Sequence, residues 1–150
     1  MFKIYCVHPI SGSTPEEVFN YYDTTQKQLT NMGFDVLTPM YGKGDIRTAN
    51  LFKTDNHEGP VTNKHAIFGR DKWMVKQADI LYANFLGATK ASIGGCFELA
   101  WGCNDHKQII LVMEKDNIHQ HAFILEAATI IFETEIEALT YLEKIAKKIS

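Results

Sequence analysis

A chain of 150 residues is long enough to bury a hydrophobic core and short enough to form a single domain, which we expect to span residues 1–150. Hydrophobic residues make up 45% of the sequence and charged residues 22%, as in ordinary globular proteins. The net charge of -3 and the lack of a basic run argue against a nucleic acid polymer as partner, and no apolar stretch approaches a membrane span.

The cysteines and the N-terminal residues both bear on the cellular compartment in which we expect the protein. Cys6, Cys96 and Cys103 show no paired spacing, so we expect buried, reduced thiols and no zinc site. The apolar run over residues 2–7 is followed at once by polar residues and is too short for a signal peptide. These features predict a cytoplasmic protein with no membrane partner.

Short apolar runs alternate with amphipathic stretches along the whole chain. In chain order they predict a strand over 2–7, a helix between 14 and 33, a strand over 34–37, a helix over 63–78, a strand over 80–84, a helix over 92–102, a strand over 108–113, a helix over 120–127, a strand over 129–132 and a helix from 134. Strands that alternate with helices form parallel sheets. We therefore expect a single-domain α/β fold, doubly wound, with a mostly parallel five-stranded sheet and helices on both faces, of the Rossmann or flavodoxin-like class.

Capping signals support the first and last helices. Thr14 and Glu17 form a capping box at the start of the first helix, and Gly33 suits its end. Apolar positions 18, 22, 25, 29 and 32 give this helix one face for the core, and positions 136, 139, 142, 145 and 149 do the same for the last helix.

Ligands bind beyond the carboxyl ends of the strands in such sheets, which directs attention to three loops. These loops cover residues 8–14, 85–92 and 114–121. A further segment, from Pro39 to about Thr62, shows no periodicity, and a loop of this length in a compact domain is usually functional or disordered.

The third predicted helix carries the main catalytic candidate, Glu98. Gly94 and Gly95 lie in the first turn, where each glycine costs about 1 kcal/mol relative to alanine. They lie one turn before Glu98, and Gly102 lies one turn after it, so we expect a face free of side chains with Phe97 pointing elsewhere. A ligand on that face would reach both the helix amides and the carboxylate. The alternative is a surface glutamate, with glycines that allow close packing of the helix on a strand.

Asp71 is the second candidate acid. Its helix runs into the third strand, so the C-terminal end of that helix lies away from the strand tips, while Asp71 lies nearer the middle. A catalytic acid and a surface charge with a neighbour one turn away explain this residue equally well.

The loop after the first strand contains small and hydroxyl residues. Ser11, Gly12 and Ser13 offer amides and hydroxyls to a phosphate or a sugar, although the loop is no Walker motif and lacks a GxGxxG pattern. An ordinary turn that leads into a helix cap explains the same residues.

Two histidines and several aromatic residues complete the set of candidates. His119 and His121 have the spacing of a metal pair, but a third ligand is not apparent and an isolated HxH usually has another role. We expect no metal and no cofactor. Tyr5, Trp73 and Trp101 are expected in the core, with stacking on a base as the alternative for one of them.

Taken together, these motifs resemble the nucleoside 2-deoxyribosyltransferase superfamily, which includes base-exchanging transferases and nucleoside 5′-monophosphate N-glycosidases. The resemblance runs over nearly the whole chain and is strongest in residues 70–80, 83–101 and 117–124.

The resemblance implies a role for each of four residues. Glu98 corresponds to the nucleophile that attacks the anomeric carbon, and Asp71 to an acid that assists departure of the base. Tyr5 corresponds to an aromatic residue near the sugar. His121 lies where the family places a polar residue that reaches into the neighbouring subunit's site, which implies a homodimer or a higher homo-oligomer.

Two positions bear on the substrate. Ser92 stands where the transferases typically carry an aspartate and the monophosphate hydrolases carry a phosphate-binding serine, so it favours a nucleotide. Ser11 stands where those hydrolases usually have an arginine, which is a departure from their pattern.

We therefore expect an N-glycosidase that cleaves the N-glycosidic bond of a (deoxy)nucleoside 5′-monophosphate through a covalent glycosyl-Glu98 intermediate and releases the free base. The alternatives are a nucleoside 2-deoxyribosyltransferase that exchanges bases and a non-catalytic nucleotide-binding or sensor domain. The expected partner is a small nucleoside or nucleotide. Its expected binding residues are Tyr5, Ser11, Gly12, Ser13, Ser92, Gly94, Gly95 and His121.

Overall fold

The computed structural model describes residues 1–44 and 59–147. Within these residues strands and helices alternate in the order β1 (Lys3–Val7), α1 (Pro15–Met32), β2 (Asp35–Leu37), α2 (Lys64–Gln77), β3 (Ile80–Asn84), α3 (Ile93–Asn104), β4 (Gln108–Val112), α4 (Ala122–Ala127), β5 (Ile130–Phe132) and α5 (Glu135–Ala146). Every predicted element is present in the predicted order, with ends that differ by one or two residues.

The five strands form one sheet in the order β2-β1-β3-β4-β5. Each neighbouring pair is parallel, so the sheet is wholly parallel in the part of the chain described. This is the flavodoxin-like strand order, in which the chain winds first to one side of β1 and then to the other. The predicted doubly wound α/β fold is confirmed.

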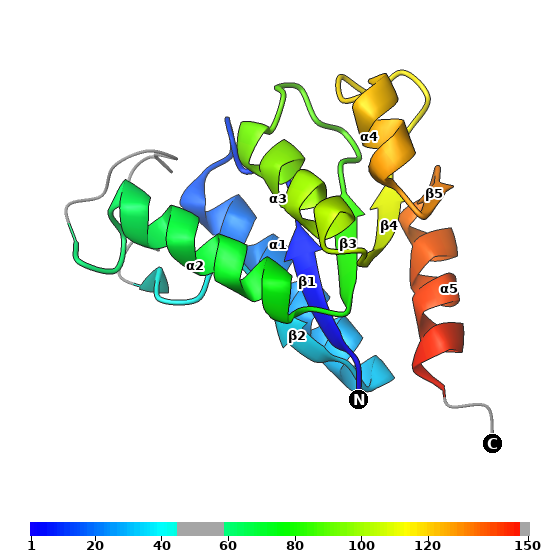
Figure 1. Cartoon of the computed structure of the whole chain (residues 1–150), viewed down its shortest axis with the longest axis horizontal. Helices are drawn as coiled ribbons and strands as arrows, with labels where there is room; N and C mark the ends of the chain where they lie inside the picture. Colours follow the sequence, from blue (N-terminus) through cyan, green and yellow to red (C-terminus); the bar gives the residue numbers. More distant parts are fainter. Residues whose placement is uncertain (45–58, 148–150) are drawn as a thin grey trace.

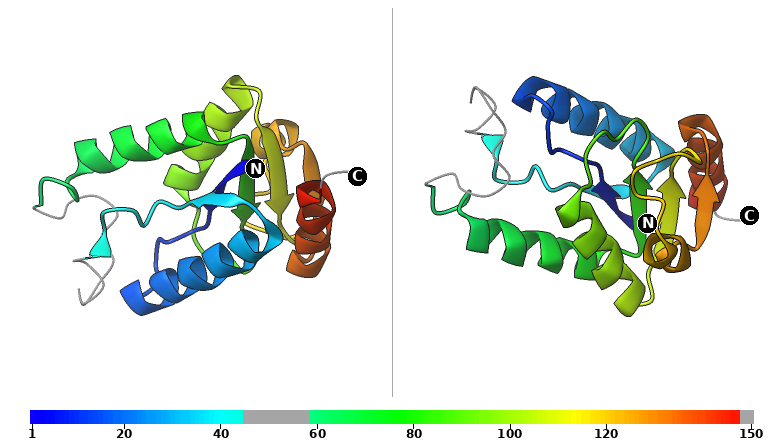
Figure 2. Two further views of the ribbon diagram at one scale, coloured as in Figure 1. Left: turned by 90° about the horizontal axis from the view of Figure 1, so that it is seen from below. Right: turned by 90° about the horizontal axis from the view of Figure 1, so that it is seen from above.

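Helices cover both faces of the sheet. α1 and α5 lie on one face, and α2, α3 and α4 lie on the other (Figures 1 and 2). Successive strand residues point to opposite faces, so Ile4 and Tyr82 pack towards α1 and α5, whereas Tyr5 and Leu81 pack towards α2 and α3. All five residues of β3 are buried, as expected for a central strand covered on both sides.

The predicted capping box of α1 is confirmed. The Thr14 hydroxyl accepts a hydrogen bond of 3.2 Å from the Glu17 amide, and the Thr14 amide donates one of 2.8 Å to the Glu17 carboxylate. Gly33 ends the helix with a left-handed φ of 100°, which a glycine adopts without strain. Val18 and Leu29 lie on the buried face, as the spacing predicts.

Two predictions about buried side chains are wrong. Trp73 is 59% exposed, because Met74 and Val75 occupy the positions of α2 that face the sheet. Cys103 is also exposed, since Gly102 takes the buried position beside it in α3.

The structure describes only part of the apolar face predicted for the last helix and only part of the long loop. Ile136 is 78% exposed rather than buried, and Ala138 and Leu142 supply the fully buried positions of α5. Ile149 and residues 45–58 of the long loop lie outside the described residues. In the residues that the structure describes, no helix is both long enough and apolar enough to span a membrane.

Candidate active site

Glu98 lies in the second turn of α3 with its carboxylate directed into the protein. Its side chain is only 8% exposed. The hydroxyl of Tyr5, which is fully buried in β1, donates a hydrogen bond of 2.6 Å to Glu98 Oε1. A short hydrogen bond to a carboxylate holds that group in one orientation and favours its ionised form.

Asp71 shares a cavity with Glu98. The cavity has a volume of about 220 Å³ and lies between α2 and α3, which are neighbours in Figure 1. Its lining residues are Lys64, Ile67, Phe68, Asp71, Gly94, Phe97, Glu98 and Trp101. Asp71 is 9% exposed, so two largely buried carboxyl groups face one small space.

The two carboxyl groups shift each other's protonation. Burial, followed by the charge of Asp71, raises the pKa of Glu98 to about 8, although the Tyr5 hydrogen bond and Lys43 act in the opposite direction. Burial raises the pKa of Asp71 to about 6, against the lowering effect of Lys43 and Arg70. Two such groups titrate as a pair, and because the pKa of Glu98 is the higher of the two, the last proton of the pair is held mainly by Glu98.

Three cations near this pair were not among the sequence candidates, and one of them, Lys64, lines the cavity itself. Lys43 is only 2% exposed, and burial lowers its pKa. Arg70 donates a hydrogen bond of 2.9 Å from Nη1 to the Val61 carbonyl. Arg70 Nε and Nη2 and Asp71 Oδ1 are buried without a hydrogen-bond partner among the described residues, so the site has unused donors and an unused acceptor.

Three aromatic side chains surround the mouth of the cavity. The ring centroids of Phe68 and Trp101 are 5.1 Å apart and those of Phe97 and Trp101 are 5.8 Å apart, both edge to face. Phe68 and Phe97 are about half exposed and line the cavity between α2 and α3. Phe97 therefore points into the cavity region, contrary to the prediction. Trp101 is only partly buried and is available to stack on a planar group.

The glycines of α3 serve different purposes. Gly94 lines the cavity, and a Cβ atom there would meet nothing within 4 Å. At Gly95 a Cβ atom would lie 2.9 Å from the Ser92 hydroxyl, and at Gly102 it would lie 2.6 Å from a Leu81 methyl group. Only Gly94 leaves space for a ligand, so the prediction of an open face along the helix is wrong for Gly95 and Gly102, which allow close packing.

Ser92 begins α3. Its hydroxyl accepts a hydrogen bond of 3.1 Å from the Gly95 amide, and its own amide donates one of 2.7 Å to His119 Nε2. His119 Nε2 is thus an acceptor, so Nδ1 carries the proton and donates to Asn117 Oδ1 at 2.9 Å. His119 joins the loop after β4 to the start of α3.

The first loop approaches the loop before α3. Gly12 has a φ of 88°, and a Cβ atom there would lie 3.5 Å from Cδ and 3.8 Å from Nζ of Lys90. The Ser13 amide donates to the Ile10 carbonyl at 3.2 Å, and Ser11 and Ser13 are partly exposed. This loop does not line the Glu98 cavity, and the Lys90 side chain lies beside its Gly12.

His121 lies apart from the Glu98 cavity within one chain. It caps α4, where its Nδ1 accepts a hydrogen bond of 3.2 Å from the Phe123 amide. It lines a second cavity, of about 380 Å³, which contains residues of α3 and α4 such as Cys96 and Ile124. Among the described residues, no group of three or more His, Cys, Asp or Glu side chains is arranged to hold a metal ion.

Comparisons with known proteins bear on the fold. No protein-family model and no curated protein matches the sequence. Among solved structures, a 2-deoxyribosyltransferase from Bacillus psychrosaccharolyticus is 19% identical with a TM-score of 0.66, over 94% of this chain and 90% of that one. A 2-deoxyribosyltransferase from Leishmania mexicana is 15% identical with a TM-score of 0.64, over 96% and 98%. A CMP N-glycosidase from Clostridium botulinum is 15% identical with a TM-score of 0.59, over 95% and 98%.

The likeness to these three structures extends over almost all of this chain and almost all of each of theirs. The strand order and the placement of helices on both faces are features of this shared architecture. The chain therefore has the fold of 2-deoxyribosyltransferases and of a CMP N-glycosidase.

Proposed function

We propose that this protein is an enzyme of the nucleoside 2-deoxyribosyltransferase superfamily that hydrolyses the N-glycosidic bond of a (deoxy)nucleoside 5′-monophosphate. The Glu98 carboxylate attacks the anomeric carbon, the C–N bond breaks, and its electron pair leaves with the base, which takes a proton from Asp71. Water then attacks the anomeric carbon and gives its proton to the Asp71 carboxylate; the bond to Glu98 breaks, which frees the sugar phosphate and restores both carboxyl groups.

The observation that carries the proposal is the pair of buried carboxyl groups in one cavity, with Tyr5 donating to Glu98. A glycosidic bond needs both a nucleophile and a proton for the leaving group. A pair that holds one proton supplies both, provided that the proton is on Asp71 when Glu98 attacks. The pKa values place the shared proton mainly on Glu98, so the reactive form, with the proton on Asp71, is the minor one. The Tyr5 hydrogen bond increases its share because it stabilises the ionised Glu98.

The same pair argues against a non-catalytic binding domain. Burial and mutual repulsion disfavour the charged forms of Glu98 and Asp71, which costs free energy of folding. A protein that only binds an anionic nucleotide gains nothing from two carboxylates beside its ligand. Sites that retain such groups are typical of catalysis.

Two features favour a phosphate on the substrate. The N-terminus of α3 is open at Gly94, and free helix amides attract anions. Lys90 lies against Gly12 in the first loop and provides a positive charge near that helix end. Ser92 is not among these features, because its hydroxyl accepts from the Gly95 amide and its own amide donates to His119.

Base transfer is the second candidate within this chemistry. Two of the solved structures that share the fold are 2-deoxyribosyltransferases, so a second base in place of water as acceptor is the natural alternative. The described part of the site contains no group that would exclude water in favour of a base.

We also propose that the active species is a homodimer or a higher homo-oligomer. Phe123 is 81% exposed and Ile118 is 53% exposed, and both border the apolar cavity that His121 lines. Exposed apolar side chains beside an apolar cavity are typical of an interface. Sedimentation velocity at assay concentration tests this, and a fully active monomer would contradict it.

Incubation with a panel of nucleosides and nucleoside 5′-monophosphates, with and without a second free base, distinguishes the functions. We expect free base and sugar phosphate from a monophosphate, and chromatography should detect no new nucleotide when a second base is added. A new nucleoside would establish the transferase. Binding without any product would establish the non-catalytic domain.

A further inference from the structure

Lys43 is a charged residue that lies buried instead of on the protein surface. Its side chain is 2% exposed, whereas lysine side chains are almost never fully buried unless they face an opposite charge. The carboxyl groups that act on it are those of Asp71 and Glu98, and Arg70 is a nearby cation. Lys43 is therefore buried within electrostatic range of both carboxyl groups.

A tight turn after β2 makes this placement possible. The Lys43 amide donates a hydrogen bond of 3.0 Å to the Met40 carbonyl, and Gly42 between them has a left-handed φ of 74°. A Cβ atom at Gly42 would lie 2.7 Å from Val61 Cγ1 and 3.2 Å from Arg70 Nη1. The absence of a side chain lets the turn press against Arg70 of α2 and Val61 of the preceding loop, which places the neighbouring, buried Lys43 close to the segment that carries Asp71.

The charged and titratable groups that face the pair come from several elements. Tyr5 of β1 and Tyr22 of α1 interact electrostatically with both carboxyl groups. Arg70 and Lys64 are the nearby cations of α2, and Lys64 lines the cavity itself. Arg70 lowers the pKa of Asp71, whereas Lys43 lowers the pKa of both Asp71 and Glu98. Among the described residues, Lys43 is thus the cation that acts on both carboxyl groups.

We propose that Lys43 is a positioning residue: its buried ammonium group is a fixed counter-charge that keeps one carboxyl group of the Asp71–Glu98 pair ionised. The pair then holds one proton rather than two, which is the state in which a nucleophile and an acid are present together. Lys43 does not line the cavity, so it acts on the carboxyl groups and not on the substrate.

Removal of this charge has a defined consequence. Without the ammonium group, burial favours the neutral form of both carboxyl groups, and the site loses its ionised nucleophile at neutral pH. An opposite charge at close range shifts a carboxyl pKa by about one to three units. The acid limb of the rate profile should therefore move to higher pH by about one unit or more.

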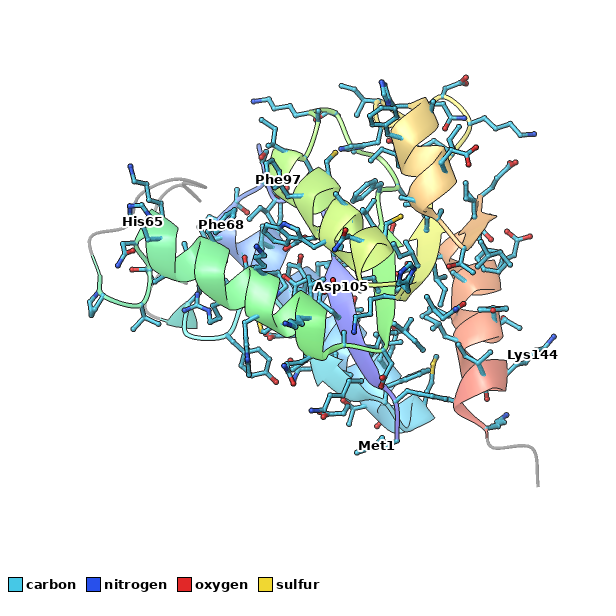
Figure 3. All side chains as sticks on the ribbon, viewed as in Figure 1. Met1, His65, Phe68, Phe97, Asp105 and Lys144 are labelled. Carbon is cyan, nitrogen blue, oxygen red and sulfur yellow. The ribbon has the colours of Figure 1, made fainter. Side chains whose placement is uncertain are left out.

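The test compares Lys43→Met, which keeps the length of the side chain, with Lys43→Arg, which keeps its charge. Lys144→Met is the control, since Lys144 lies on the exposed side of α5, far from the cavity (Figure 3). The first measurement is carboxyl ¹³C NMR titration of Asp71 and Glu98 in the free protein. The second measurement is the pH profile of kcat/KM. This second measurement rests on the proposed function, because it requires glycosidase activity.

We expect Lys43→Met to raise the first carboxyl titration by about one unit or more and to move the acid limb equally, while Lys43→Arg and Lys144→Met leave both near the wild type. Carboxyl titrations that do not move in Lys43→Met would overturn the proposal even if the rate falls. If Lys43→Met does not fold, Lys43→Gln replaces it, and failure of both to fold at pH 5 would show a purely structural lysine. Should no glycosidase activity exist, the NMR titration still decides the role of Lys43, so the two proposals fail separately.

Discussion

The Tyr5 hydroxyl and the Glu98 carboxylate meet at 2.6 Å across the interface between β1 and α3. The fully buried Tyr5 ring fixes the hydroxyl, and the hydrogen bond fixes the carboxylate that faces the cavity. The opposite face of the sheet offers a comparable pair, in which the Tyr82 hydroxyl donates to Glu135 Oε1 at 3.2 Å. The two pairs share their chemistry, but only the first faces the proposed site.

Tyr5→Phe removes the hydroxyl and leaves the ring in place. A hydrogen bond to a charged group contributes roughly 1.5–3 kcal/mol, so we expect kcat to fall by about tenfold or more, together with a rise in the pKa of Glu98. Steady-state kinetics with the best monophosphate measure this. The matched control is Tyr82→Phe, which should retain the wild-type rate; equal losses in both variants would mean that Tyr5 serves stability alone.

The rate should depend on pH in a bell shape. The pKa values of Asp71 and Glu98 are raised to about 6 and about 8, so below pH 6 both groups are protonated and no nucleophile is present. Above pH 8 both are ionised and the leaving base receives no proton. A profile of kcat/KM with limbs near these two values is expected for the pair as a whole. A rate that stays constant from pH 5 to pH 9 would contradict the role of the pair.

Asp71→Asn should slow the reaction according to the quality of the leaving group. General acid catalysis contributes about 10²–10⁴-fold, and it matters least when the base leaves easily. We expect a loss in that range for natural substrates and a much smaller loss for a substrate with an activated leaving group. Equal losses on both substrates would indicate that Asp71 has a structural role.

Lys90→Met tests the preference for a phosphate. An exposed charge pair is worth up to about 1 kcal/mol, so KM for the monophosphate should rise by roughly fivefold and KM for the nucleoside should remain unchanged. Lys144→Met serves as the control for a lost surface charge. If the wild-type enzyme has a higher kcat/KM for free nucleosides than for monophosphates and exchanges bases readily, the predicted phosphate preference is wrong. The protein would then be a nucleoside 2-deoxyribosyltransferase.

The fold was predictable because its signals are local. Thr14 and Glu17 are three residues apart and form the predicted cap, and the apolar spacing of α1 matches its buried face. The parallel pairing of the strands follows from their alternation with helices, but the order β2-β1-β3-β4-β5 was not predicted, because right-handed crossovers allow more than one order.

The site was only partly predictable, since its remaining features depend on contacts distant in sequence. Gly94, Gly95 and Gly102 look alike in the sequence, and only the packing of Phe85 and Leu81 separates the open position from the two crowded ones. The burial of Lys43 depends on a turn that packs against Val61 and Arg70 in another segment. No periodicity or motif marks such a contact.

The central claim is that Glu98 forms a covalent bond to the sugar during turnover. The most direct measurement is mass spectrometry of peptides from enzyme quenched in acid during turnover of its best monophosphate, with Glu98→Gln as the matched control. In the wild type we expect an ester between Glu98 and the anomeric carbon of the sugar 5-phosphate. In the variant we expect no adduct and a loss of turnover of about 10³-fold or more. An adduct on Asp71, or near-normal turnover by Glu98→Gln, would contradict the claim.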